Sequence, residues 1–438
     1  MMRNYKSLLR LGVLLVGLVS ALNVSAAWEQ IQKLPATQCV FVAPNGNLIS
    51  SDFIFEHTGG IWCSQDKGTT WTKCDVDDYA YGVMVQAGDY IIAAGEGCNL
   101  ARSKDNGVTW EVLNYGYMFL DYIGEEGVEW DVAYAMTYFK GKLFVADFSG
   151  GGVIYSEDFG ETWTLTDRES LKYDVGGVKS TAKDAYALDS YYSLAESDGN
   201  LLLFGVYFIY RYNESDNTWE LLRSDSNFMG VNTLYDGKLV CGRAITNYTD
   251  QVPFLEYTAD GGKTWGVVAR PEGMIDNNVR AIHSDEKGLY VGLQNGGLYF
   301  TDNFGESWSF ISDGMPTMND EGAYEVPMII TSDADYVYMA VYKEPWLQSD
   351  VSGVYRLAKS ELPVAAVDKV KTDAVVGYVF DNTLYINGVA DVTIYTVSGV
   401  KVCAEEGCER VDLSGLADGV YVYEAVMDGN RITGKFAK

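Results

Sequence analysis

Short apolar stretches alternate with turn-forming residues along most of the chain. One unit shows this clearly, with apolar stretches at 281–284, 289–293, 297–300 and 308–311. Stretches this short, rich in β-branched and aromatic residues, predict β-strands rather than helices. The second stretch of the unit recurs at 91–94, 143–146, 201–204 and 239–241. We therefore predict an all-β fold built from repeated units of about four strands.

An eight-residue pattern, S-x-D-x-G-x-T-W, closes these units. Clear copies begin at Ser64, Ser103, Ser156 and Thr258, and weaker copies begin at Tyr212 and Thr301. Asp hydrogen-bonds the backbone two residues on, Gly supplies a positive φ, and the Trp ring is buried as the return strand begins. The predicted structural residues are Asp66, Asp105, Asp158, Asp260, Trp71, Trp110, Trp163 and Trp265. We expect the pattern to form β-hairpin turns, and its Asp residues to be structural rather than catalytic.

This repeat resembles the Asp-box, or BNR, repeat of sialidases, sortilin-like propellers, xyloglucanase-type glycosidases and photosystem assembly factors. The resemblance implies a seven-bladed β-propeller over residues 27–362, with four-stranded blades and Asp-box hairpins. The seventh unit keeps its strands, at 337–340 and 353–357, but has lost the pattern. A motif shared by so many activities indicates an architecture and does not name a reaction.

The long connections are expected on one face of this propeller. The turns between first and second strands, and those between third and fourth strands, are short. The long segments are 114–131, 168–184, 244–253 and 342–352, and they join strands at the opposite ends. A rigid scaffold with elaborated loops on one face commonly binds there. We therefore predict a binding surface on the face opposite the Asp-boxes.

A linker at 363–367 is followed by a second unit of short strands, residues 368–438, predicted as a small Ig-like β-sandwich. The stretches 392–399 and 411–421 resemble the C-terminal sorting domain of type IX secretion. That resemblance implies a Bacteroidetes-like source.

Residues 1–26 are typical of a signal peptide. Arg3 and Lys6 precede the apolar run 11–22, and small residues at 24–26 suit cleavage. No later segment is long and apolar enough to span a membrane. We predict an exported protein located in the periplasm, on the cell surface or outside the cell.

Charge and cysteine content narrow the possible partners. The net charge of −29 repels phosphate backbones and argues against nucleic-acid binding. Seven cysteines in an exported chain permit disulfides, and the spacing of Cys403 and Cys408 predicts a local bridge, while the other pairings stay open. With two His and no paired C-x-x-C, we expect neither a metal nor a cofactor.

A sialidase of the usual kind is disfavoured. Such an enzyme grips the substrate carboxylate with three Arg, because the guanidinium fork matches a carboxylate. The chain has no Arg between Arg10 and Arg102, so the first blade lacks such a residue. A nucleophilic triad is also poorly supported, and we expect His283 to be a buried residue of an inner strand.

The segment 114–131 is the leading candidate surface. Its aromatic residues include Tyr117 and Trp130, which Tyr173 and Trp346 extend from neighbouring loops. Aromatic rings beside carboxylates suit a glycan platform, whereas the alternative is that the rings pack the segment onto the blades. Glu129 and Asp131 are the candidate catalytic pair if the protein is a glycosidase.

A second candidate surface is cationic. Arg243 and Arg280, with Arg270 between them, come from adjacent blades and suit an anion site. The alternative is that each Arg pairs with a nearby acid such as Glu272, Asp276 or Asp285. We interpret the protein as a monomeric, non-catalytic propeller that binds a glycan or an extracellular or periplasmic protein. The alternatives are a glycoside hydrolase and a protein-assembly factor.

Overall fold

The computed structural model describes residues 27–363 and 378–437, apart from internal segments of which the longest are 115–132, 180–190, 244–252, 317–325 and 343–350. The predicted signal peptide therefore lies outside the described residues. The chain divides into two compact units, Met1–Val364 and Ala365–Lys438, called here the propeller unit and the C-terminal unit.

Apart from one short two-stranded hairpin, the described strands of the propeller unit form seven four-stranded antiparallel sheets, numbered here in chain order. Sheet 1 contains β2 (Thr37–Val42), β3 (Leu48–Asp52), β4 (Gly60–Ser64) and β5 (Thr72–Lys73). Sheet 2 contains β6 (Tyr81–Ala87), β7 (Tyr90–Gly95), β8 (Asn99–Ser103) and β9 (Glu111–Asn114). Sheet 3 contains β10 (Ala133–Phe139), β11 (Lys142–Asp147), β12 (Val153–Ser156) and β13 (Thr164–Leu165).

The remaining sheets of this unit follow the same order. Sheet 4 contains β16 (Tyr191–Ser197), β17 (Asn200–Gly205), β18 (Phe208–Asn213) and β19 (Thr218–Ser224). Sheet 5 contains β20 (Phe228–Tyr235), β21 (Lys238–Arg243), β22 (Leu255–Thr258) and β23 (Gly266–Val268). Sheet 6 contains β24 (Val279–Ser284), β25 (Leu289–Leu293), β26 (Gly297–Thr301) and β27 (Ser309–Phe310). Sheet 7 contains β28 (Val326–Ser332), β29 (Tyr336–Tyr342), β30 (Gly353–Ala358) and β1 (Glu29–Lys33).

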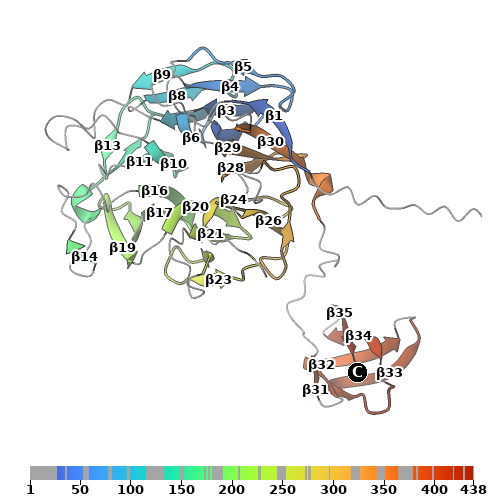
Figure 1. Cartoon of the computed structure of the whole chain (residues 1–438). Coiled ribbons are helices and arrows are strands. Elements are labelled where there is room, and N and C mark those ends of the chain that lie inside the picture. Colours follow the sequence, from blue (N-terminus) through green and yellow to red (C-terminus); the bar gives the residue numbers. More distant parts are fainter. Residues whose placement is uncertain are drawn as a thin grey trace, which may run out of the picture. The chain divides into compact units, whose positions relative to one another are not determined.

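The seven sheets are arranged as the blades of a propeller (Figure 1). The first strand of each sheet contacts the first strands of both neighbours, and β28 contacts β2, so the ring is closed. Apolar cores lie between adjacent sheets. Ile92 and Leu100 of sheet 2, for example, are fully buried in one cluster with Leu143 and Val145 of sheet 3. Burial between sheets accounts for the apolar strand pattern of the sequence.

The ring is closed by the first described strand of the chain. β1 pairs antiparallel with β30, opposing Glu29 to Arg356 and Lys33 to Gly353. No strand at Glu29–Lys33 was predicted from the sequence. The fourth strand of sheet 7 therefore comes from the other end of the propeller unit.

Few other elements occur among the described residues. They include the 3-10 helices η1 (Arg168–Leu171) and η3 (Lys359–Glu361) and a hairpin of β14 (Asp174–Val175) and β15 (Val178–Lys179). Helical turns in the described part of the chain are short, and none has the length and apolar character needed to span a bilayer.

The C-terminal unit contains one five-stranded antiparallel sheet among its described residues. Its strands are β31 (Tyr378–Phe380), β32 (Thr383–Thr396), β33 (Lys401–Asp412), β34 (Val420–Met427) and β35 (Asn430–Ala437). The long strand β32 pairs with β31, β33 and β34. The Ig-like sandwich stays a prediction for this unit.

The predicted bridge between Cys403 and Cys408 is wrong. Cys403 lies opposite Ile394 and Cys408 opposite Ala390, and both thiols are free. Ile394 and Ala390 are four residues apart on β32, a span of about 13 Å, which exceeds the reach of a disulfide. The bulge on β33 between Glu405 and Cys408 lets both thiols pack against the same core. The other described cysteines are free as well.

Candidate functional site

The eight-residue repeat forms a self-contained hydrogen-bonded turn. In sheet 3, Asp158 Oδ1 accepts hydrogen bonds from Ser156 Oγ (2.7 Å) and from the Thr162 amide (2.8 Å). Asp158 Oδ2 accepts from Thr162 Oγ1 (2.6 Å), and Ser156 Oγ accepts from the Gly160 amide (2.8 Å). Trp163 Nε1 donates to the Gly160 carbonyl (3.1 Å). Both carboxylate oxygens are therefore used inside the turn.

The same contacts recur in three other sheets. Asp66, Asp105 and Asp260 accept hydrogen bonds from the amide and hydroxyl of the Thr four residues on. In sheet 6, Asn303 takes the place of the Asp. Hydrogen bonds from the Thr264 side chain and amide lower the pKa of Asp260 to about 2. A carboxylate held in this way is a poor proton carrier, which fits a structural role.

These turns also join neighbouring sheets. We call the connection between first and second strands the first turn, and that between third and fourth strands the last turn. Both lie at one edge of the ring, the turn rim. The last turn of sheet 3 places Phe159 against Tyr90 beside the first turn of sheet 2, with ring centroids 5.1 Å apart. Phe304 stacks on Tyr235 in the same way between sheets 6 and 5.

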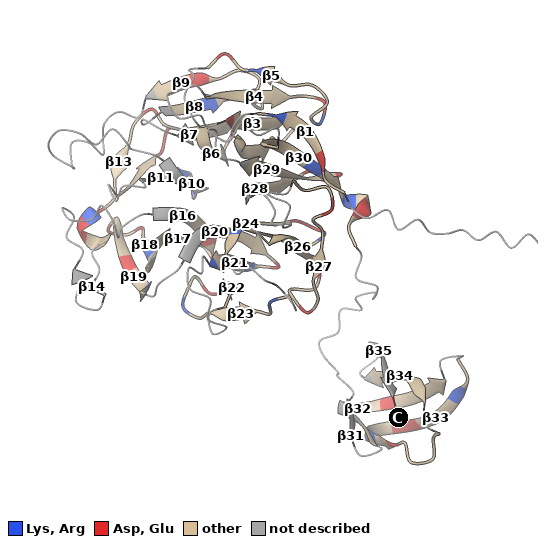
Figure 2. Ribbon diagram, viewed as in Figure 1, with Lys and Arg blue, Asp and Glu red and all other residues tan. Residues whose placement is uncertain are grey.

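Polar contacts also join adjacent sheets at the turn rim, and each boundary between two adjacent sheets is called a seam here. Asn47 Nδ2 donates to the Asn106 carbonyl between sheets 1 and 2 (3.1 Å). Arg102 on β8 binds Glu111 on β9 (2.8 Å) and Glu161 in the last turn of sheet 3 (2.6 Å); basic and acidic residues are blue and red in Figure 2. The turn rim therefore carries a contact between each of these turns and the preceding sheet.

The last turn of sheet 4 departs from the pattern. Tyr212 replaces the Ser or Thr, and its hydroxyl donates to Asn217 Oδ1 (2.8 Å). Asn217, which has a positive φ of 61°, donates from Nδ2 to the Leu165 carbonyl (3.1 Å). Its own carbonyl accepts from the Asp167 amide (2.8 Å). This turn is therefore attached to sheet 3 through the side chain and the carbonyl of Asn217.

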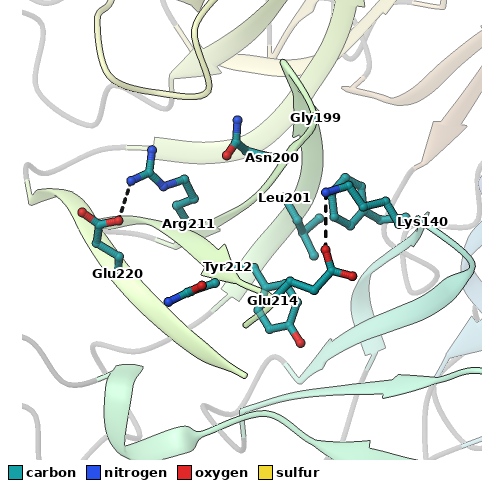
Figure 3. Close-up of a pocket in the computed structure, with 10 residues that line it drawn as sticks. Lys140, Gly199, Asn200, Leu201, Arg211, Tyr212, Glu214 and Glu220 are labelled. Atoms are coloured by element: carbon teal, nitrogen blue, oxygen red, sulfur yellow. Dashed lines mark hydrogen bonds and ion pairs between the residues drawn. The ribbon is translucent and has the colours of Figure 1, made fainter. Parts of the chain in front are cut away.

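A cavity of about 380 Å³ opens between sheets 3 and 4 beside this turn (Figure 3). The side chains at its edge include Lys140, Asn200, Arg211, Tyr212, Glu214 and Glu220. Lys140 belongs to the first turn of sheet 3, Asn200 begins β17, and Arg211 and Glu220 face each other across β18 and β19. The first turn of sheet 3 and the first and last turns of sheet 4 thus contribute to one site.

Two ion pairs lie on opposite sides of the cavity in Figure 3. Lys140 Nζ is 3.4 Å from Glu214 Oε2, and both side chains are about half exposed, at 50% and 51%. Arg211 Nη2 is 2.5 Å from Glu220 Oε2. The inner wall is apolar, because Phe139 and Leu201 are buried. The cavity therefore presents two cations and two carboxylates above an apolar base.

One arginine of the predicted cationic site belongs to a buried ion pair. Arg243 Nη1 lies 2.8 Å from Glu256 Oε2, and both side chains are buried. Arg223 of sheet 4 binds the other oxygen of Glu256 at 3.1 Å. Arg243 is therefore paired with an acid, although with Glu256 rather than with Asp285. Arg280 is half-buried in β24, one sheet further on.

His283 lies in the inner strand β24, as expected. Its Nε2 is 2.9 Å from Ser332 Oγ of sheet 7, and its ring stacks on Tyr290. Burial, together with the positive charge of Lys359, lowers the pKa of His283 to about 4, although Asp285 and Glu286 oppose the shift. The imidazole is therefore neutral near pH 7 and serves as a contact between inner strands.

The other predicted site residues lie outside the described residues: Tyr117, Glu129, Trp130, Asp131, Tyr173 and Trp346. Glu272 and Asp276 do so too. Within the described ranges, no group of three or more His, Cys, Asp or Glu side chains is placed to hold a metal ion.

Sequence reasoning did not identify the cavity between sheets 3 and 4. One signal was present, since YNESDNTW at 212–219 departs from the repeat where the cavity opens. Lys140, which pairs with Glu214 of this segment from the adjacent sheet, lies in a two-residue turn that resembles other such turns in the sequence. Which turns lie side by side depends on how adjacent sheets pack, and a local sequence pattern does not contain this information.

Comparisons with known proteins bear on the fold alone. No family model and no curated protein matches the chain. The structure titled YCF48 bound to D1 peptide has a TM-score of 0.50 and 13% identity, covering 78% of this chain and 99% of that one. The extracellular domain of BT4673 from B. thetaiotaomicron has a TM-score of 0.49 and 11% identity, covering 94% of this chain and 59% of that one.

A third similar structure is PorZ, a surface component of the type-IX secretion system of Porphyromonas gingivalis. It has a TM-score of 0.39 and 11% identity, covering 89% of this chain and 64% of that one. This chain thus spans less than two thirds of the BT4673 and PorZ chains. At identities this low the likeness shows a shared β-propeller fold and assigns no activity.

Proposed function

We propose that this protein is an exported, non-catalytic β-propeller that binds a protein partner through the rim opposite the turn rim. The observation that carries the proposal is the uneven length of the connections. Two residues separate β10 from β11 on the turn rim, whereas on the other rim β9 ends at Asn114 and β10 begins at Ala133. Long connections on a rigid ring supply the variable surface that recognition requires.

The chemistry of the turn rim supports a non-catalytic role. The Asp carboxylates of the repeat turns are consumed by hydrogen bonds within their own turns. At the end of β21 away from the turn rim, Arg243 is paired with Glu256. The similar structure of YCF48 is bound to a peptide, which makes a protein ligand the preferred partner class here.

The finer assignments belong to the same proposal. The repeat turns are Asp-boxes, and the C-terminal unit is a type IX sorting-like module. The hydrogen bonds of the turns support the first assignment, and the strand pattern after residue 383 supports the second. On the rim opposite the turns, Tyr117, Trp130, Tyr173, Arg280 and Trp346 are the proposed contact residues.

The test is affinity capture of extracellular and periplasmic proteins, with cross-links mapped by mass spectrometry. We expect cross-links to 114–131, 244–253 or 342–352, and loss of capture in Trp130→Ala or Trp346→Ala. Lys142→Ala, on the turn rim, is the control and should capture normally. Cross-links confined to the turn rim would contradict the proposal.

The same protein should be screened on a glycan array and in hydrolysis assays. Glycan binding abolished by Trp130→Ala would replace the protein partner with a sugar. Turnover that is lost in Glu129→Gln or Asp131→Asn while binding remains would establish a glycoside hydrolase instead.

A further inference from the structure

The cavity between sheets 3 and 4 lies on the turn rim, away from the rim assigned to the partner. At the seam between sheets 2 and 3, Phe159 packs beside Gly88 and Tyr90. At the seam between sheets 5 and 6, Phe304 packs on Tyr235. The corresponding space beside Tyr212 is left as a cavity of about 380 Å³. That volume falls at the small end of the range for ligand pockets.

Hydrogen bonds away from the cavity hold sheets 3 and 4 together. Trp219 Nε1 donates to Thr166 Oγ1 (2.9 Å), and the Trp219 amide donates to Ser170 Oγ (2.8 Å). Asn217 adds its hydrogen bonds to the Leu165 and Asp167 backbone. Sheet 4 is therefore held to sheet 3 by its outer strand, so the space near Lys140 is not needed for packing.

The lining excludes a sugar platform. The aromatic residues of the cavity, Phe139 and Tyr212, are 5% and 8% exposed, so neither offers a free ring face for stacking. The accessible groups are instead ionised. Lys140, Glu214 and Glu220 are each half exposed or more, whereas Arg211 is 22% exposed.

The pair Lys140–Glu214 is suited to opening. Its 3.4 Å separation is longer than the roughly 2.7–2.9 Å of a strong charge-assisted hydrogen bond. Half-exposed ion pairs are also weak, because water competes for both groups. Arg211 uses Nη2 for Glu220 and carries further N–H donors on its guanidinium. A ligand can therefore enter between the two pairs at little cost.

We propose that this cavity binds a zwitterion, namely a free amino acid. Lys140 and Arg211 receive its carboxylate, and Glu214 and Glu220 receive its ammonium group. The charges of these four side chains sum to zero, although the whole chain has a net charge of −29. A ligand that carries one positive and one negative group therefore leaves none of the four side chains without an opposite charge. A lone anion or cation would leave one pair uncompensated.

The test is calorimetric titration of the purified protein with the twenty free L-amino acids. The strongest ligand is then compared with its N-acetyl and carboxamide derivatives. Removal of either charge should weaken binding about tenfold or more. Equal binding of the blocked derivatives, or no binding at millimolar concentration, would overturn the proposal.

Variants locate the site and separate it from the partner surface. Lys140→Ala and Glu214→Ala should each weaken binding about tenfold. Lys142→Ala and Glu157→Ala each remove one partner of an ion pair of sheet 3 that does not line the cavity, and both variants should bind normally. Trp130→Ala should also bind normally, so failure of the partner-binding proposal would leave this result unchanged. Binding that survives both cavity variants would contradict the assignment.

Discussion

Lys359 Nζ lies 2.8 Å from Asp285 Oδ2, and the two side chains are only 3% and 8% exposed. The pair joins η3, at the end of sheet 7, to the first turn of sheet 6. Lys359 also reaches the exposed Glu286 at 3.1 Å. Burial would raise the pKa of Asp285, but hydrogen bonds from Lys359, Ser332 and the Lys287 amide outweigh it and hold the pKa below its usual value.

Replacing Lys359 should strongly destabilise the propeller unit. Lys359→Met leaves the Asp285 carboxylate buried without its cation, which costs about 3–5 kcal/mol. Chemical denaturation followed by tryptophan fluorescence measures the loss. The double variant Lys359→Met/Asp285→Asn removes both charges and should recover much of the stability. A double variant no more stable than the single one would contradict this account.

His283 should make the free energy of unfolding of the propeller unit depend on pH, at pH values higher than those at which carboxylates titrate. Its pKa falls from 6.5 to about 4 on folding, so the unfolded chain takes up the proton first as the pH falls. The stability contribution is complete above pH 6.5 and is lost between pH 6.5 and about 4. The total is on the order of 3 kcal/mol.

The variant His283→Gln isolates that effect. Its free energy of unfolding, measured in denaturant from pH 7 to 4, should fall less steeply than that of the parent protein. The Asp285 contribution is lost only at lower pH, as the pH falls through its depressed pKa. Parallel profiles for parent and variant between pH 6.5 and 4 would refute the assignment.

Replacing the Asp of a repeat turn should lower the stability of the propeller unit, whereas replacing the neighbouring Glu should not. Asp158→Ala removes the acceptors for Ser156 and Thr162, with an expected loss of about 1–3 kcal/mol. Glu157→Ala removes an exposed partner of Lys142 and should change stability by less than about 0.5 kcal/mol. Thermal unfolding compares the two variants. Similar losses in both would argue against a structural role specific to Asp158.

A methyl group added at Gly353 of β30 should weaken the pairing of this strand with β1. This residue has a φ of 150°, and an added Cβ would lie 1.9 Å from the Gln32 carbonyl oxygen of β1. Gly141, with a φ of 85° and open space around it, is the matched control. Gly141→Ala should cost about 1–2 kcal/mol from backbone strain. Gly353→Ala should cost a further 1–3 kcal/mol, because β1 must shift away.

The comparison of these two variants tests closure itself. Limited proteolysis should release β1 from Gly353→Ala more readily than from Gly141→Ala. Equal rates of cleavage between β1 and β2 would show that the contact with Gln32 does not hold the strand.

The local parts of this fold could be predicted from the sequence because their causes are local. The Asp158 turn places every hydrogen-bond donor and acceptor within eight residues, so a short pattern identifies it. The four strands of sheet 6 were likewise predicted to within one or two residues. Alternating apolar residues indicate strands wherever one face meets a neighbouring sheet.

The contacts between sheets could not be predicted in the same way. Lys359 and Asp285 are 74 residues apart, and nothing near either one specifies the other. Pairing of Arg243 with an acid was the alternative to an anion site, but its partner Glu256 is fixed by the register of β21 against β22. The cavity beside Glu214 depends on the first turn of sheet 3. Each of these features is decided by packing between elements rather than by propensity within them.

The pairing of β1 with β30 joins residues that lie far apart in the sequence. Glu29 and Arg356 are separated by 327 residues, so this contact forms only when nearly the whole unit is present. Contacts of such separation slow folding, because a very long loop must close before the pairing stabilises anything. A chain that emerges from its amino end must therefore carry β1 unpaired until β30 appears. Until then the backbone N–H and C=O groups of β1 lack their partners on β30, and closure is the step that commits the ring to its folded state.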